Sequence, residues 1–121
     1  MTKVAINKCY GGFSLSEKAF EMLLNRKGVK YDKVKGKYFN LTGHDYYHEG
    51  HVGDDSQYIS EYEYRRDRAD TDLIAVIEEL GEEANGRCAE IDIVEIPDDV
   101  QWEVDEYDGK EWVAEVHRTW Y

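Results

Sequence analysis

Proline, cysteine and long apolar runs are scarce in this sequence, and their scarcity excludes several classes of protein. There is one proline in 121 residues, with 41% hydrophobic and 35% charged residues, which is the composition of a globular chain rather than a disordered one. No run approaches the roughly 18 apolar residues that a membrane-spanning helix needs. A strand-like pattern follows Met1 at once, without the apolar stretch of a signal peptide, so we expect a soluble cytoplasmic protein.

Only two cysteines are present, Cys9 and Cys88, and neither lies in a Cys-x-x-Cys motif or at the spacing of a zinc site. Each lies within or at the end of an apolar strand-like run. A free cysteine generally packs as a small hydrophobe, so we expect two buried free thiols. A disulfide or a nucleophilic cysteine is the alternative.

Periodicity and capping residues predict two helices and two clear strands. Lys3–Cys9 alternates apolar and polar side chains as a strand does, and Cys88–Ile96 repeats the pattern. Ser16–Lys27 begins with a good N-cap and carries an apolar stripe at helical spacing, as does Asp70–Ala84.

The middle of the chain has weaker patterns. Val29–Tyr31 and Lys37–Phe39 are candidate short strands, and Tyr58–Tyr64 alternates aromatic with polar residues as a strand would. Thr42–Asp55 is rich in glycine and polar residues and predicts a surface loop.

The last segment predicts a β-hairpin with two conceivable registers. A two-residue loop, Asp108-Gly109, would set Trp102 opposite Glu115. A three-residue loop, Tyr107-Asp108-Gly109, gathers apolar residues on one face and puts Gly109 at the left-handed position. The pairs in that register are Val104 with Trp112, Trp102 with Ala114, and Val100 with Val116. We predict this second register.

Together these elements predict a single α+β domain over residues 1–121. We expect a mixed or antiparallel sheet of about four to six strands, with two helices packed on one face and a hairpin at the C-terminal end.

Charge is distributed unequally along the chain, whose formal net charge is −12. Residues 1–66 carry a net +2 and residues 67–121 a net −14. A rear half this acidic repels nucleic-acid phosphates but attracts a basic protein surface. The alternative is a solvated face that keeps the protein soluble. The partner-binding residues predicted on this basis are Glu103, Asp105, Glu111 and Glu115.

A glycine turn between the first strand and the first helix is a candidate site for an anion or a small nucleotide. Backbone N–H groups of such a turn can hold a phosphate or carboxylate, although the P-loop spacing and its lysine are absent. An arginine and aromatic residues near the chain end could stack on a base. Glycines at such turns are more often structural. The residues of this prediction are Tyr10, Gly11, Gly12, Ser14, Arg118 and Trp120.

A histidine-rich segment is a weak metal candidate. His44, His48 and His51 alternate with carboxylates, and imidazole with carboxylate can bind a transition metal. The glycines around them favour a solvated loop, so we expect no metal and no cofactor. No nucleophile motif accompanies the serines, and we expect no enzyme.

A resemblance to a known family rests on the opening KVAINKCYGGFSLS (residues 3–16) and on five later stretches. These are DTD (residues 70–72), EELG (78–81), VEIPD (94–98), WEVDEYDG (102–109) and HRTW (117–120). These resemble a family of small uncharacterised proteins encoded in bacteriophage and prophage genomes. The similarity covers roughly residues 3–28 and 67–120. It implies an accessory protein in the cytoplasm of an infected bacterium, of a kind that often inhibits host machinery or defence. A minor structural or assembly role is a further alternative.

Overall fold

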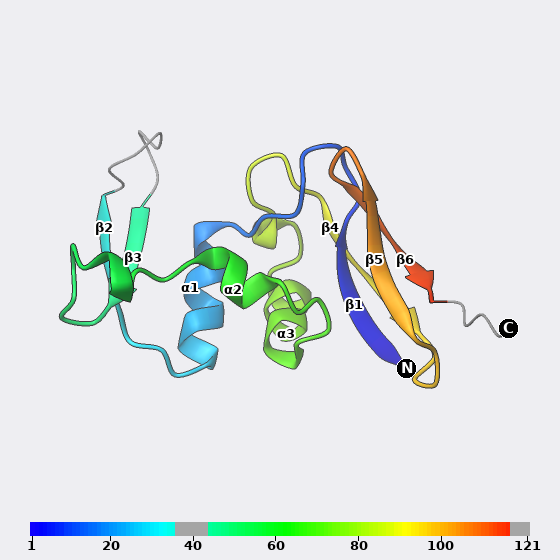
Figure 1. Cartoon of the computed structure of the whole chain (residues 1–121), viewed down its shortest axis with the longest axis horizontal. Helices are drawn as coiled ribbons and strands as arrows, with labels where there is room; N and C mark the ends of the chain where they lie inside the picture. Colours follow the sequence, from blue (N-terminus) through cyan, green and yellow to red (C-terminus); the bar gives the residue numbers. More distant parts are fainter. Residues whose placement is uncertain (36–43, 117–121) are drawn as a thin grey trace, which may run out of the picture.

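The protein is an α+β domain in a computed structural model that describes residues 1–35 and 44–116 (Figure 1). Within these residues there are three α-helices and six strands, and the strands form three antiparallel pairs, β1–β4, β2–β3 and β5–β6. The strands are β1 (Thr2–Asn7), β2 (Tyr31–Lys35), β3 (His44–His48), β4 (Ile91–Ile96), β5 (Trp102–Tyr107) and β6 (Lys110–Glu115). The helices are α1 (Glu17–Arg26), α2 (Glu61–Arg65) and α3 (Thr71–Leu80), with 3-10 turns at Asp55–Gln57 and Gly81–Ala84.

The elements follow one another along the long axis of the molecule. Figure 1 shows β2–β3 at one end, then α1 and α3, then β1–β4, with the hairpin β5–β6 at the opposite end. The predicted class and the C-terminal hairpin are therefore confirmed. The strands are divided among three small sheets, whereas a single sheet was predicted.

The helix α1 links two hydrophobic cores. Its Ser16 cap accepts a hydrogen bond from the Ala19 N–H at 3.1 Å, which satisfies a donor of the first turn. One core joins α1 and α3 to Ala5 of β1, so both predicted helices cover the same face of β1–β4. The other core joins the far side of α1, through Phe20 and Leu24, to Tyr46 of β3.

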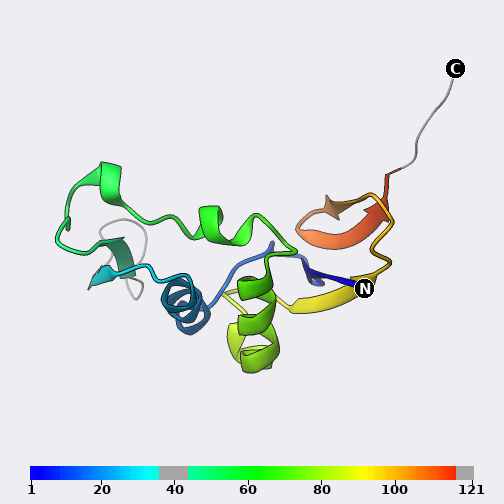
Figure 2. The ribbon, with the colours of Figure 1, turned by 90° about the horizontal axis from the view of Figure 1, so that it is seen from below.

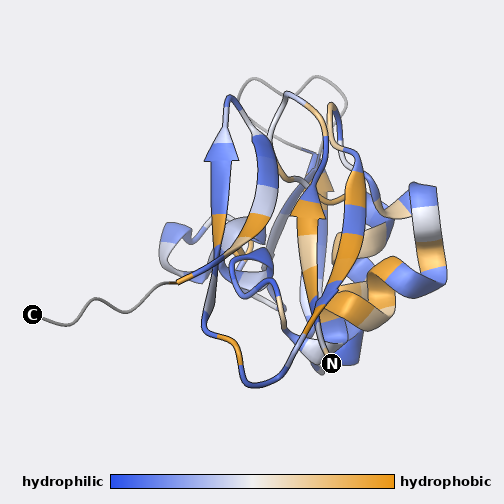
Figure 3. Cartoon of the chain, turned by 90° about the vertical axis from the view of Figure 1, so that its right-hand side faces the viewer, coloured by the Kyte–Doolittle hydropathy of each residue, from blue (hydrophilic) through white to orange (hydrophobic). Residues whose placement is uncertain are grey.

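The hairpin β5–β6 lies beside β1, with β6 next to the strand (Figures 2 and 3). It does not extend the sheet, because side chains and a loop occupy the outer edge of β1. The Ala5 N–H donates to the Arg68 carbonyl at 2.8 Å, and the Asn7 N–H donates to the Glu111 carboxylate at 2.8 Å. An edge occupied in this way cannot pair with another strand. This capping explains why β5–β6 does not join the sheet of β1 and β4.

The hairpin register differs from the prediction. Trp102 lies opposite Glu115 and Val104 opposite Val113, with Asp108-Gly109 as a two-residue loop. Both loop residues have positive φ, 51° and 89°, which is the geometry of the favoured type I′ turn. The three-residue register was wrong because the turn preference outweighs the gathering of apolar residues on one face.

Two predictions for the middle of the chain also need correction, and a third is not tested. Tyr58–Tyr64 is not a strand: its residues from Glu61 on belong to α2, whose first turn is acidic and whose Glu61 pairs with Arg65 at 3.3 Å. The predicted loop Thr42–Asp55 contains β3, which pairs with β2. The candidate strand Lys37–Phe39 lies outside the described residues.

Candidate functional site

The hairpin β5–β6 presents two chemically different faces, because opposite residues of an antiparallel pair point to the same side. One face carries Glu111, which lies toward Arg68 in the interior. The other carries Glu103 with Ala114, Asp105 with Trp112, and Tyr107 with Lys110. Figure 3 shows the hairpin strands as largely hydrophilic beside the more apolar β1 and β4.

The inner face is held by a buried ion pair. The Arg68 guanidinium donates to both Glu111 oxygens at 2.6 and 2.9 Å, and the two side chains are 15% and 8% exposed. Arg68 also lies 3.9 Å from the centre of the Phe13 ring and donates to the Ala5 carbonyl. Glu111, predicted as a partner-binding residue, is therefore a structural residue that fastens the hairpin to β1 and to the segment before α3.

The outer face combines carboxylates with exposed aromatic rings. Glu103 is exposed and Asp105 is half-buried. The side chains of Trp112 on β6 and Tyr107 on β5 are 45% and 72% exposed. Lys110 and Ala114 lie on the same outward side, and we call its acidic and aromatic residues Glu103, Asp105, Tyr107 and Trp112 the hairpin face. Glu115, the fourth predicted residue, is exposed but lies on the opposite side of the hairpin, across from Trp102.

Lysines and arginines of the front half neutralise many carboxylates of the rear half. Lys8 binds Asp92 at 2.7 Å, and Lys3 binds Glu78 at 2.9 Å. The hydrogen bond from Lys8, with a second one from the Ile93 N–H, holds the pKa of Asp92 below its usual value. The rear carboxylates in ion pairs are Asp70, Asp72, Glu78, Glu83, Asp92, Asp98 and Glu111.

The carboxylates left over are concentrated toward the hairpin. In the described part of the chain, those after residue 89 with no ion pair are Glu90, Glu95, Asp99, Glu103, Asp105, Glu106, Asp108 and Glu115. Asp67, Glu79 and Glu82 of the rear half also have no ion pair among the described residues, so the hairpin carries five of these eleven carboxylates.

The predicted anion site lies where three turns meet. A Cβ on Gly109 would lie 2.7 Å from the Gly11 nitrogen, and a Cβ on Gly11 would lie 2.9 Å from the Cys88 Cβ. The buried Asn7 joins these turns, since its amide donates to the carbonyls of Cys9 and Gly109 at 2.8 Å. The glycines thus permit close approach of main-chain segments, which is the structural role expected for glycines at such turns.

A shallow hollow remains on the outside of this junction, bordered by Tyr10, the two glycines and the hairpin turn. Its rim includes Asp108, and a carboxylate there opposes a phosphate ligand. Ser14 donates its hydroxyl to the Arg87 carbonyl at 3.3 Å and so is engaged elsewhere. Arg118 and Trp120, the other predicted members, lie outside the described residues.

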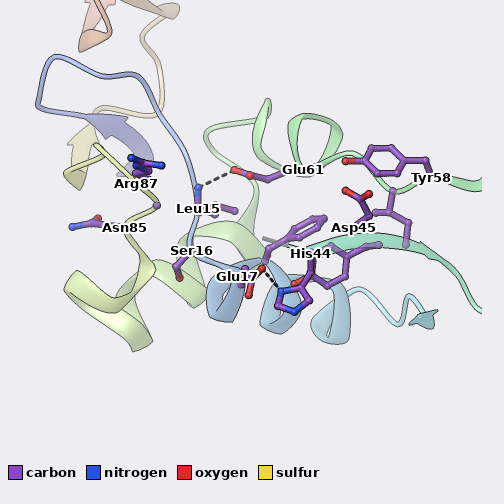
Figure 4. Close-up of a pocket in the computed structure, with 13 residues that line it drawn as sticks. Leu15, Ser16, Glu17, His44, Asp45, Tyr58, Glu61, Asn85 and Arg87 are labelled. Carbon is purple, nitrogen blue, oxygen red and sulfur yellow. Dashed lines mark hydrogen bonds and ion pairs between the residues drawn. The ribbon is translucent and has the colours of Figure 1, made fainter. Parts of the chain in front are cut away.

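A cleft that sequence reasoning missed lies between α1, β3 and the loop before β4 (Figure 4). It has a volume of about 460 Å³. His44 Nδ1 lies 2.6 Å from Glu17, and the figure places Asn85 and Arg87 on the opposite side from Asp45 and Tyr58. Burial and the nearby Asp45 carboxylate raise the pKa of Tyr58. The sequence showed Glu17 in the first turn of a helix, but it could not show that His44, 27 residues further along the chain, is its partner in this cleft.

The histidines are not gathered into a metal site in the part of the chain that the structure describes. His44 and His48 lie at opposite ends of β3, and a spacing of four positions along a strand corresponds to about 13 Å. His51 lies beyond the strand, where its N–H donates to the His48 carbonyl at 3.0 Å.

The cysteines are less buried than predicted. Cys88 is exposed and Cys9 is half-buried, and both are free thiols. Cys88 has a φ of 65°, which shows that it lies in a turn before β4 and not in the strand. The expectation of two buried thiols was therefore wrong.

Comparison with known proteins adds no relative. No family model, no curated protein and no solved structure matches the chain. None of the described helices has the length and apolar character needed to cross a membrane.

Proposed function

We propose that this protein is a binding protein whose hairpin face docks on a basic surface of another protein. The observation that supports it is the hairpin face itself, where Glu103 and Asp105 flank a Trp112 that is 45% exposed. A large exposed aromatic residue ringed by polar groups is a common energetic centre of protein interfaces. Its ring can also accept a cation from a partner lysine or arginine.

The charge pattern supports a partner of positive charge. Since the front-half lysines are already engaged with rear-half carboxylates, few of them screen the hairpin face. A basic partner would be steered to it from a distance, with an association rate that falls as salt rises. The resemblance to bacteriophage and prophage proteins suggests a bacterial host protein as the partner, with inhibition of a host factor as the outcome.

Affinity capture from a bacterial lysate tests the proposal. The immobilised protein should retain a protein with a lysine- and arginine-rich surface at low salt and release it at high salt. The double substitution Glu103→Lys and Asp105→Lys should abolish this retention.

The matched control is Glu79→Lys with Glu82→Lys. It makes the same change in net charge at exposed carboxylates of α3 and the following 3-10 turn, away from the hairpin. If the control variant loses the captured protein as completely as the hairpin variant, net charge and not the hairpin face determines binding.

A small-molecule ligand is the second candidate function, and the cleft of Figure 4 is the observation that favours it. Glu17, Asp45 and Glu61 line this cleft, so a cationic or zwitterionic ligand suits it better than a nucleotide. A thermal-shift panel of amines and nucleotides tests it, because a ligand at 100 times its Kd stabilises a protein by about 2.7 kcal/mol. Absence of any shift would remove this candidate.

A further inference from the structure

The only two cysteines of the chain are brought together by the fold. The Cys9 thiol donates to the Cys88 carbonyl at 2.8 Å, although 79 positions separate them in the sequence. The pairing of β1 with β4 produces this proximity: Asn7 lies opposite Ile91, and the Lys8 N–H donates to the Glu90 carbonyl at 2.8 Å just beyond. Cys9 follows Lys8 on the segment after β1, and Cys88 precedes Glu90 on the segment before β4.

The contact between the two residues limits how far apart they can lie. A Cys9 sulfur at 2.8 Å from the Cys88 carbonyl oxygen keeps the two Cα atoms within about 8 Å of each other, from standard bond lengths. Disulfides usually span Cα separations of about 4.4–6.8 Å, inside this bound. Cys88 also faces the turn that follows Cys9, since a Cβ on Gly11 would lie 2.9 Å from the Cys88 Cβ.

Accessibility assigns different parts to the two thiols. Cys88 is exposed and can meet a small oxidant in solution. Cys9 is half-buried, and its thiol also lies 3.4 Å from the side-chain oxygen of Asn7. An exposed thiol beside a less accessible one is the arrangement of an attacking and a resolving cysteine.

We propose that Cys9 and Cys88 form a reversible disulfide when the protein meets a low-molecular-weight disulfide. The Cys88 thiolate attacks one sulfur of the small disulfide and releases a small thiolate, leaving a mixed disulfide on Cys88. The Cys9 thiolate then attacks the Cys88 sulfur and releases the second small thiolate. Two electrons pass from the protein to the small disulfide, and the two protons of the protein thiols end on the released thiols or in solvent.

The link would fasten the turn after β1 to the turn before β4. The turn after β1 also contacts Gly109, so the disulfide would lie near the turn of the hairpin β5–β6. A covalent link across a loop of this length restricts the unfolded chain strongly and should raise the Tm. This inference does not depend on the partner of the hairpin face.

Oxidised glutathione tests the proposal. The folded protein should lose about 2 Da without gaining an adduct, and a non-reducing peptide map should contain a Cys9–Cys88 linked pair. The Tm should rise and return to its starting value after dithiothreitol. With Cys9→Ser, the reaction should stop at a glutathione adduct on Cys88, and with Cys88→Ser neither the link nor the rise in Tm should occur.

The same reaction in urea supplies the control for proximity. The folded protein should form the link faster than the unfolded chain does, because only the fold places the thiols together. Stable glutathione adducts on the folded wild-type protein, a disulfide-linked dimer, or equal rates in the folded and unfolded states would each overturn the proposal.

Discussion

At the scale of single residues, three buried polar side chains attach the hairpin to the rest of the molecule. Asn7 is fully buried, and its side-chain amide donates to the carbonyls of Cys9 and Gly109 while its side-chain oxygen accepts from the Glu90 N–H. Arg68 and Glu111 form a bidentate ion pair. Glu111 also accepts from the Asn7 N–H and so occupies the edge of β1. Satisfied networks of this kind are costly to interrupt, since each member left alone is a buried unpaired group.

The substitution Glu111→Gln tests this attachment. It keeps the shape of the side chain but leaves the Arg68 charge, 15% exposed, without its counter-ion. We expect a loss of about 3 kcal/mol in the free energy of unfolding, measured by urea denaturation. Glu115→Gln on the same strand is exposed and should change it by less than about 0.5 kcal/mol. Equal effects of the two substitutions would show that the ion pair does not hold the hairpin.

At the scale of elements, the turn of the hairpin is fitted against the turn after β1. Gly109 and Gly53 both have a φ of 89°, but only Gly109 has main-chain atoms where a Cβ would lie. Both alanine substitutions should therefore incur the strain of positive φ, about 1 kcal/mol or more. Gly109→Ala should lose a further 1–3 kcal/mol or so in free energy of unfolding because of the clash. Similar losses in urea denaturation would show that the two turns do not touch.

Glu21 is one of the carboxylates of α1 that anchor the hairpin β2–β3, and its contacts predict a pH dependence. Burial disfavours the ionised form, but hydrogen bonds from Lys33, Tyr46 and Tyr31 hold the pKa of Glu21 below its usual value. Because the folded pKa is the lower one, this stabilisation is complete above about pH 4.5 and is lost as the pH falls through the folded pKa.

Glu21→Gln should accordingly lower the free energy of unfolding by about 1–2 kcal/mol at pH 7. The difference from the wild-type protein should shrink toward pH 3, as measured by urea denaturation across this range. Glu79→Gln, on an exposed carboxylate of α3, should leave the pH dependence unchanged. A difference that stays constant with pH would contradict a role for the Glu21 charge.

The elements that could be predicted from the sequence are those with local signals. Ser16 and the apolar stripe behind it sufficed for α1, and alternation sufficed for β1. The alternation in Tyr58–Tyr64 misled, because the short helix α2 depends on local ion pairs such as Glu61 with Arg65. The contacts Arg68–Glu111 and Glu17–His44 join residues 43 and 27 positions apart, and no local pattern announces them.

At the scale of the whole molecule, ion pairs that form on folding neutralise part of the acidic half of the chain. The sequence predicted a net −14 over residues 67–121, without showing which carboxylates would be neutralised. Lysines of the front half reach across to α3 and β4, through Lys27 with Asp70 and Lys8 with Asp92. The hairpin receives little of this compensation and retains the exposed Trp112 and Tyr107 among its carboxylates.

The most direct test of the hairpin face as a recognition surface is an NMR titration of the ¹⁵N-labelled protein with a lysine- and arginine-rich peptide. We expect the amide shifts to change first at Glu103, Asp105, Tyr107 and Trp112, with an affinity that weakens as salt is raised. Shifts spread evenly over all exposed carboxylates, or centred on Glu79 and Glu82, would contradict the account.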